Sequence, residues 1–205
     1  MFNRIPEPEL MEDDNQCEYY NQSLFENTDA LIKFVETYKE KINVEDGTII
    51  DLGTGTANFV IELCNTYPKL KAVCYEASEA MIKIAKNNIV KHNLQDRITI
   101  IKDNFFNATG TFDVVIANRV LHHVNDTYKF WKLVNILSKN ILVCDLERPD
   151  DINSIKDWFD IDVQNSFKAA YNVDEVREQT TEYGYSILRE SIGYGFFNYT
   201  VYQKR

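Results

Sequence analysis

The chain has 205 residues, a mass of 23.9 kDa, a formal net charge of −10 and 44% hydrophobic residues. This length suits one globular domain with a full core. Because so acidic a surface repels phosphate backbones and anionic lipid, we expect neither nucleic acid nor a membrane among its partners.

The first half of the chain alternates between strand-like and helix-like text. Residues 1–26 are polar, acidic and proline-bearing, which predicts a tail or lid. Apolar residues at helical spacing predict a helix over 27–43. A strand at 48–51, a helix at 57–66, a strand at 71–76 and a helix at 78–93 follow in turn. Repeated strand–helix units favour a parallel sheet.

The alternation continues to about residue 147. The segments "ITIIKD" (98–103) and "FDVVIAN" (112–118) predict buried strands, and a helix at 126–138 leads to a fifth strand at 141–147. Residues 149–170 read as irregular, and a helix is expected at 173–183. The end, 185–204, predicts a hairpin about a glycine-bearing turn. We therefore expect an α/β, doubly wound (Rossmann-like), mostly parallel seven-stranded sheet, with an antiparallel C-terminal edge hairpin and an N-terminal helical lid.

The cysteines, histidines and N-terminus contain no signal of export or metal binding. The four cysteines form no C-x-x-C pair, and the three histidines lack zinc-ligand spacing, so we expect no metal. The N-terminus carries charges and prolines where a signal peptide needs an apolar core. No apolar run is long enough to span a bilayer. These features favour a cytoplasmic protein.

A glycine-rich turn follows the first strand of the sheet. Gly53 and Gly55 allow a tight turn in which main-chain N–H groups approach a ligand. The pattern G-x-G-x-A is weak evidence alone, but it leaves a strand and opens a helix. Three acids, Asp51, Glu76 and Asp103, stand at the carboxyl ends of successive strands, the edge where open α/β sheets bind ligands.

The sign of the charge discriminates between nucleotide cofactors. A dinucleotide would bring its diphosphate towards Asp51, and two like charges a few ångströms apart cost about 1–4 kcal/mol, depending on the local dielectric. No lysine or arginine follows Asp51 until Lys69. S-adenosylmethionine instead carries an ammonium and a sulfonium, which an acidic pocket attracts. The acids therefore favour S-adenosylmethionine over a nicotinamide dinucleotide.

Four segments in order resemble the motifs of class I S-adenosylmethionine-dependent methyltransferases. They are "IIDLGTGTA" (49–57), "VCYEASEAMIKIAKNN" (73–88), "IKDNFF" (101–106) and "FDVVIANRVLHHVND" (112–126). The resemblance is strong over residues 48–147 and looser beyond them, and Ala57 replaces the usual last glycine of the first motif. It implies one domain, 1–205, with a tail or lid (1–26), a cofactor-binding core (27–147), and an acceptor side with the terminal hairpin (148–205).

The resemblance also implies roles for individual residues. Glu76 would bind the ribose, Asp103 the adenine amino group, and either Ala77 or Met81 would pack on the adenine; Met81 also has the spacing of a core residue. Asn118 and Arg119 would lie beneath the sulfur, although Arg119 also suits a surface ion pair. The implied cofactor-binding set is Asp51, Gly53, Thr54, Gly55, Glu76, Ala77, Met81, Asp103, Asn104, Phe105, Asn118 and Arg119.

The chemistry of methyl transfer requires few side chains, since alignment of the nucleophile, methyl and sulfur supplies most of the acceleration. A base is needed only for a protonated nucleophile. Adjacent His122 and His123 point different ways, so at most one faces the pocket, and we predict His123 as the catalytic base. Packing or starting a helix is an alternative role for either histidine.

The acceptor is harder to predict than the cofactor. The fourth-strand segment lacks the N/D-P-P-Y/F motif of nucleobase methyltransferases, and the chain is acidic, which favours a small-molecule acceptor methylated at N or O by in-line displacement. Candidate acceptor contacts are Tyr20, His122, Arg148 and Tyr171. An NAD(P)-dependent oxidoreductase and a non-catalytic cofactor-binding relative stay open as alternatives, and the sequence predicts no oligomeric state.

Overall fold

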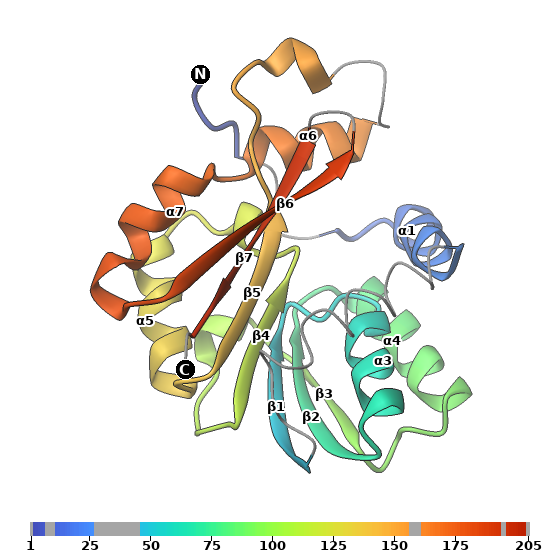
Figure 1. Cartoon of the computed structure of the whole chain (residues 1–205). Helices are drawn as coiled ribbons and strands as arrows, with labels where there is room; N and C mark the ends of the chain where they lie inside the picture. The colour runs from blue at the N-terminus through green and yellow to red at the C-terminus, as the bar shows by residue number, and fades with distance from the viewer. Residues whose placement is uncertain (1, 7–10, 27–45, 156–160, 194–195, 204–205) are drawn as a thin grey trace.

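The computed structural model describes residues 2–6, 11–26, 46–155, 161–193 and 196–203 (Figure 1). The helix predicted at 27–43 lies outside these residues. The strands are β1 (Asp46–Leu52), β2 (Lys69–Glu76), β3 (Ile98–Lys102), β4 (Val114–Asn118), β5 (Ile141–Leu146), β6 (Ser186–Gly193) and β7 (Phe196–Tyr202). The α-helices are α1 (Asp14–Glu26), α3 (Asn58–Thr66), α4 (Glu79–Lys91), α5 (Thr127–Leu137), α6 (Ile161–Ala169) and α7 (Val173–Thr180). Short 3-10 turns are η1 (Phe105–Asn107), η2 (Leu121–His123), η3 (Ile152–Ile155) and η4 (Thr181–Tyr183).

The strands form one seven-stranded sheet in the order β3-β2-β1-β4-β5-β7-β6. Strands β1 to β5 are parallel, and β7 runs antiparallel between β5 and β6. The predicted doubly wound sheet and C-terminal antiparallel hairpin are confirmed, with β6 as the edge strand. The strand order reverses between β1 and β4, and open α/β sheets bind ligands beyond the carboxyl ends of the strands at such a point.

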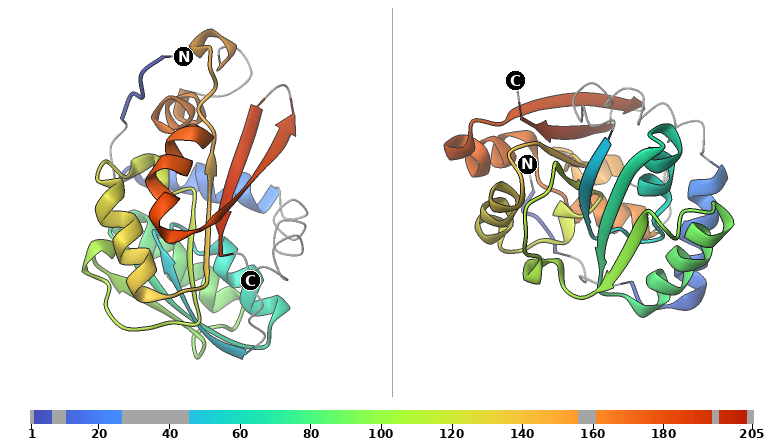
Figure 2. Two further views of the ribbon diagram at one scale, coloured as in Figure 1. Left: turned by 60° about the vertical axis from the view of Figure 1, so that its left-hand side comes forward. Right: turned by 90° about the horizontal axis from the view of Figure 1, so that it is seen from below.

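Helices cover both faces of the sheet (Figure 2). On one face, residues of α3 and α4 such as Val60 and Ala85 pack against Ile49 of β1. On the other, Phe130 and Trp131 of α5 are fully buried against the sheet. Because both faces are covered, the central strands are apolar on both sides, and every residue of β5 is buried.

Helix α6 lies in the stretch that the sequence predicted to be irregular. Its sequence, IDVQNSFKA, begins with β-branched and polar residues of low helix propensity. Phe167 nevertheless packs with Leu146, Ile155 and Phe196 in a small cluster above the end of β5. Tertiary packing therefore stabilises a helix that local propensity does not predict, and the prediction was wrong at this point.

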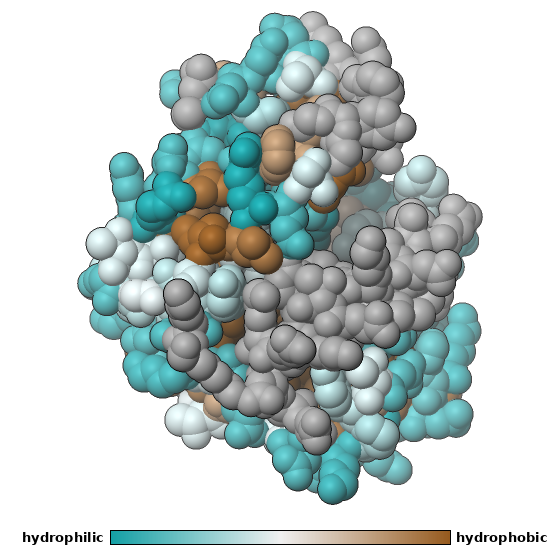
Figure 3. All heavy atoms as spheres, viewed as in Figure 1, coloured by the Kyte–Doolittle hydropathy of each residue, from teal (hydrophilic) through white to brown (hydrophobic). Residues whose placement is uncertain are grey.

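On the face drawn in Figure 3, the coloured residues are mostly hydrophilic, apart from one brown, apolar area. Ile192 of β6 is 42% exposed. Among the described residues, no helix is long and apolar enough to cross a membrane.

Candidate functional site

The carboxylate of Glu76, the last residue of β2, is hydrogen-bonded to the main chain of the glycine turn. Its Oε2 accepts a hydrogen bond from the Gly55 main chain at 2.8 Å. Its Oε1 accepts two more from the main chains of Ala77 and Ser78, each at 2.9 Å. The acid predicted to bind the ribose and the turn predicted to hold the methionine part therefore meet at one edge of the sheet.

The glycine turn has left-handed backbone geometry at three positions. Gly53 has a φ of +72°, and a Cβ there would lie 2.8 Å from Cγ2 of Val120. Gly55 has a φ of +55°, with open space where its Cβ would stand. Ala57, which replaces the usual glycine, also has a positive φ of 64°. A non-glycine residue in this region is held there by its surroundings, at a cost of about 1–2 kcal/mol.

Asp51 lies beneath this turn, at the end of β1, and is only 3% exposed. Burial raises the pKa of its carboxyl to about 7; the neighbouring Thr54 side chain acts in the opposite direction, and the charge of Glu76 raises the pKa further. Asp51 is therefore poised to change its charge near neutral pH, and a cation bound at the turn would favour the ionised form.

The segment after β3, predicted to hold the adenine, is organised by its own polar groups. Oδ1 of Asp103 accepts hydrogen bonds from the Asn104 main chain at 2.7 Å and from Nδ2 of Asn107 at 2.8 Å. Phe105 packs edge-on against Phe130, with ring centroids 6.1 Å apart. Met81 lies in an apolar cluster with α1. The predicted adenine contacts of these residues stay predictions.

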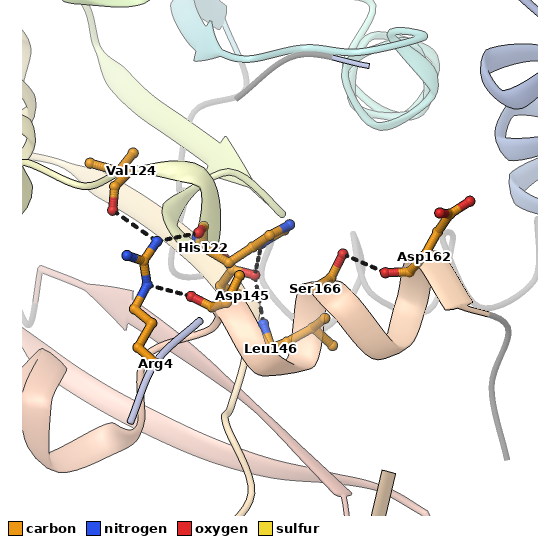
Figure 4. Close-up of polar contacts among 8 residues, drawn as sticks. Arg4, His122, Val124, Asp145, Leu146, Asp162 and Ser166 are labelled. Atoms are coloured by element: carbon orange, nitrogen blue, oxygen red, sulfur yellow. Dashed lines mark hydrogen bonds and ion pairs between the residues drawn. The ribbon is translucent and has the colours of Figure 1, made fainter. Parts of the chain in front are cut away.

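The loop after β4 holds a buried histidine–aspartate pair. Nδ1 of His122 lies 2.7 Å from Oδ1 of Asp145, and the His122 main chain donates to Oδ2 of the same carboxylate at 2.9 Å (Figure 4). Burial raises the pKa of Asp145, but the charge and hydrogen bonds of His122 and the charge of Arg119 together hold it below its usual value. Since Asp145 is ionised and only accepts, Nδ1 of His122 carries the proton of this hydrogen bond, and in the neutral ring Nε2 is the nitrogen that can accept a proton.

Asp145 was not among the predicted residues. The signal that could have found it was the one used for Asp51 and Glu76, because Asp145 is an acid near the carboxyl end of β5. His123, the predicted base, is half-buried, and its ring packs at a tilt against that of His122, with ring centroids 4.1 Å apart. Asn118 ends β4, and Arg119 has a φ of +60°, a left-handed conformation that marks local strain.

Two residues near the N-terminus, Arg4 and Tyr20, lie close to residues of the predicted site. The guanidinium of Arg4 donates to the carbonyl oxygen of His122 at 2.6 Å and to that of Ala169 at 2.5 Å (Figure 4). Tyr20, on α1, is half-buried; burial raises its pKa, the charge of Arg119 lowers it, and Glu76 raises it again. Tyr20 therefore lies close to charged groups from both sides of the predicted cofactor position.

The two remaining predicted acceptor residues have protein partners. The Tyr171 hydroxyl donates to the carbonyl oxygen of Val124 at 2.6 Å. Arg148 is 4% exposed and donates to the Ala170 carbonyl oxygen at 2.9 Å and to Glu175 at 2.6 Å. Arg148 also lines a cavity of about 440 Å³ at the rim of β5 and β7. Contact of Tyr171 and Arg148 with an acceptor stays a prediction.

The residues at this edge fit S-adenosylmethionine. The open space at Gly55 allows a ligand to approach the main chain, and the Glu76 carboxylate stands next to it. Buried Asp51 provides the negative charge that an ammonium or sulfonium favours. Within the described ranges, no group of three or more His, Cys, Asp and Glu side chains could hold a metal ion.

A family model described as a methyltransferase domain matches residues 43–191, more than half of the chain. The chain belongs to this methyltransferase domain family. With the four motifs in order and the seven-stranded sheet, the match identifies an S-adenosylmethionine-dependent class I methyltransferase. The alternative of an NAD(P)-dependent oxidoreductase is thereby excluded.

Curated relatives match over part of their length. A bifunctional methyltransferase of Rickettsia typhi is 33% identical over 94 residues, which are 45% of this chain and 18% of the relative. A ribosomal protein L11 methyltransferase of Staphylococcus haemolyticus is 30% identical over 101 residues, 48% of this chain and 30% of the relative. The chain thus matches less than a third of the length of either relative.

Solved structures share the fold over most of the chain. A S-adenosylmethionine-dependent methyltransferase from Aquifex aeolicus has a TM-score of 0.70 at 15% identity, covering 95% of this chain and all of the other. The plantazolicin methyltransferase, solved with S-adenosylhomocysteine and a desmethylplantazolicin analogue, has a TM-score of 0.65 at 15% identity, covering 86% and 84%. Magnesium protoporphyrin IX methyltransferase from Synechocystis, solved with S-adenosylmethionine, has a TM-score of 0.61 at 15% identity, covering 87% and 79%.

Proposed function

We propose that this methyltransferase transfers the methyl group of S-adenosylmethionine to an N or O atom of a small-molecule acceptor by in-line displacement. The observation that carries the proposal is the buried His122–Asp145 pair after β4, with its Nδ1–Oδ1 distance of 2.7 Å. Such a pair suits a nucleophile that starts protonated, because it provides a base whose tautomer is fixed.

The cofactor would lie along the carboxyl edge of β1, β2 and β4. Glu76 would accept hydrogen bonds from the ribose hydroxyls, and the turn from Gly53 to Gly55 would hold the amino-acid part next to the charge of Asp51. The bound cofactor would supply a methyl group on a positively charged sulfur. The leaving group of the transfer is the neutral thioether, S-adenosylhomocysteine. Arg119 and the acceptor-side residues would then lie near the methyl group.

The task of His122 is to receive the acceptor's proton at Nε2. Asp145 holds the ring through Nδ1 and stabilises the imidazolium that forms, since both side chains are almost fully buried. His123 was predicted for this role, but the carboxylate is bonded to His122. We therefore assign the base to His122, and the acceptor contact predicted for His122 becomes contact with the reacting group.

A small acceptor is supported by the surroundings of the pair. Arg4, near the N-terminus, bonds to His122 of η2, and Tyr171 bonds to Val124, the next residue after η2, so the acceptor side is partly covered. A net charge of −10 disfavours RNA. Two structural neighbours are named for plantazolicin and magnesium protoporphyrin IX, whereas curated relatives are named for ribosomal RNA and ribosomal protein L11.

The test is release of S-adenosylhomocysteine from S-adenosylmethionine with a panel of hydroxyl, carboxyl and amine compounds, and in parallel with ribosomal RNA and protein L11. We expect turnover with members of the small-molecule panel. Turnover with only the RNA or the protein would refute the small acceptor.

The base assignment has its own test with the acceptor so found. His122→Asn should lower the rate by about 10²–10⁴-fold, the range of general base catalysis. His92→Asn, at an exposed histidine on the far end of α4, is the matched control and should leave the rate unchanged. If His123→Asn removes the activity and His122→Asn does not, the original assignment to His123 stands.

A further inference from the structure

Three buried amide side chains connect α1 to the back of the glycine turn. Asn21 comes from α1, Asn58 begins α3 and Asn88 lies on α4; they are 5%, 7% and 1% exposed. They meet around Thr56, the residue between Gly55 and Ala57, which is 1% exposed. Buried amides keep their place only when their hydrogen bonds are made, so the arrangement is a specific one.

The hydrogen bonds of this cluster determine the orientation of its amide groups. Nδ2 of Asn88 donates to the carbonyl oxygen of Thr56 at 3.0 Å and to Oδ1 of Asn21 at 2.9 Å. Because a main-chain carbonyl only accepts, the nitrogen of Asn88 must face Thr56, and Asn21 must present its oxygen to it. The same oxygen accepts from Nδ2 of Asn58 at 3.2 Å, which also lies 3.1 Å from the Thr56 hydroxyl. Oδ1 of Asn21, on α1, therefore accepts a hydrogen bond from each of the other two amides.

The cluster holds the part of the turn between two residues with left-handed backbone geometry. Gly55 and Ala57, on either side of Thr56, have positive φ angles of 55° and 64°. The bond from Asn88 fixes the carbonyl of the peptide between Thr56 and Ala57, and the bond from the Gly55 main chain to Glu76 fixes the opposite side. The turn is thus held from behind by amides and from the ligand side by the predicted ribose acid.

A second attachment joins α1 to the same edge of the sheet. The Ser78 hydroxyl donates to the carbonyl oxygen of Met11 at 2.6 Å, while the Ser78 main chain donates to Glu76. Cys17 packs with Ala80 and Met81 in the apolar cluster between α1 and α4. Asn21 immediately follows Tyr20, so the amide cluster also sets where Tyr20 lies relative to Glu76 and Arg119.

We propose that Asn21, Asn58 and Asn88 form a latch that couples the docking of α1 to the cofactor-binding shape of the glycine turn. The amides are positioning residues: they act through the turn and through α1. By linkage, cofactor binding then strengthens α1 docking by the same factor by which docked α1 strengthens cofactor binding. The proposal rests on the use of S-adenosylmethionine and is independent of the acceptor, so an error about the acceptor leaves it intact.

The test measures the affinity for S-adenosylhomocysteine by isothermal titration in the full chain. Asn21→Ala and Asn88→Ala should each weaken binding about 5- to 30-fold, the effect of losing one or two buried hydrogen bonds. The double variant should bind only slightly more weakly than the weaker single variant, because both changes open the same latch. Asn15→Ala, at an exposed asparagine on α1, is the matched control and should stay within twofold of the wild type.

A second readout separates the latch from general stability. Amide hydrogen exchange over residues 11–26 should slow when S-adenosylhomocysteine binds the wild type, and this slowing should shrink in Asn88→Ala, whose changed residue is not on α1. If Asn88→Ala fails to fold, Asn21→Ala carries the affinity test, because α1 lies outside the sheet. Three results would each overturn the proposal. They are affinities of the folded variants within twofold of the wild type, additive losses of binding free energy in the double variant, and an exchange rate in α1 that does not change when S-adenosylhomocysteine binds.

Discussion

The charge of Asp51 should make cofactor binding depend on pH. Burial and the charge of Glu76 raise the pKa of Asp51 to about 7, although the neighbouring Thr54 side chain acts in the opposite direction. In the free protein the carboxyl is therefore mostly neutral below that pH. The ammonium and sulfonium of the cofactor favour the ionised form, so binding lowers this pKa and releases a proton. Affinity should accordingly rise with pH up to about 7 and level off above it.

The size of the effect follows from the same pKa. If only the ionised form of Asp51 binds, the affinity should be lower than its plateau by about tenfold at pH 6 and about 100-fold at pH 5, taking the pKa as about 7. Any residual binding by the neutral form reduces these factors. A variant at Asp51 is needed to assign the effect to this carboxyl.

The assay is isothermal titration of S-adenosylhomocysteine and S-adenosylmethionine between pH 5 and 7.5, in two buffers of different ionisation enthalpy to count protons. Asp51→Asn, which keeps the size and removes the charge, should bind more weakly at pH 7.5 and give a nearly flat profile. A wild-type affinity that is constant or falls as pH rises would refute the reasoning. An Asp51→Asn profile that matches the wild type would assign the titration to another group.

Three further predictions concern the turn, the ribose acid and the pair. Gly53→Ala should lower the free energy of unfolding by about 2–3 kcal/mol, because the new Cβ combines a positive φ with a close contact on Val120. Gly55→Ala has a positive φ but open space around its Cβ, so it should lower the free energy of unfolding by only about 1 kcal/mol. Equal decreases for the two variants in urea denaturation would contradict this geometry. Glu76→Ala should weaken S-adenosylhomocysteine binding about 10- to 100-fold in titration calorimetry, because the carboxylate's charged hydrogen bonds are lost; retained affinity would place the ribose elsewhere. Asp145→Asn should lower methyl transfer by about 10²–10⁴-fold while leaving cofactor affinity within about threefold, and a rate like that of the wild type would remove the pair from the chemistry.

The sheet and its ligand-binding edge were predictable because they follow from local patterns. Continuous apolar runs between helical stretches predicted the parallel strands, and an acid after such a run marked the edge where Asp51 and Glu76 lie. The prediction failed for α6, because that helix depends on contacts of Phe167 with distant strands and not on its own sequence.

Hydrogen bonds between residues that are distant in the sequence could not be predicted either. Nothing in the text "LHH" tells which histidine meets a carboxylate 23 positions later, since the choice depends on how the η2 segment turns after Arg119. The amides of Asn21 and Asn88 lie 67 positions apart, and each on its own is an ordinary polar residue of a helix. Long-range polar contacts of this kind carry no periodic signal and emerge only once the elements are packed.

A crystal structure of the protein with S-adenosylhomocysteine tests the account's central claim most directly. We predict that the ribose hydroxyls bind the carboxylate of Glu76, that the amino-acid part lies along the turn from Gly53 to Gly55, and that the sulfur faces the ring of His122. A ribose bound away from Glu76, or a sulfur directed away from the His122–Asp145 pair, would contradict the account.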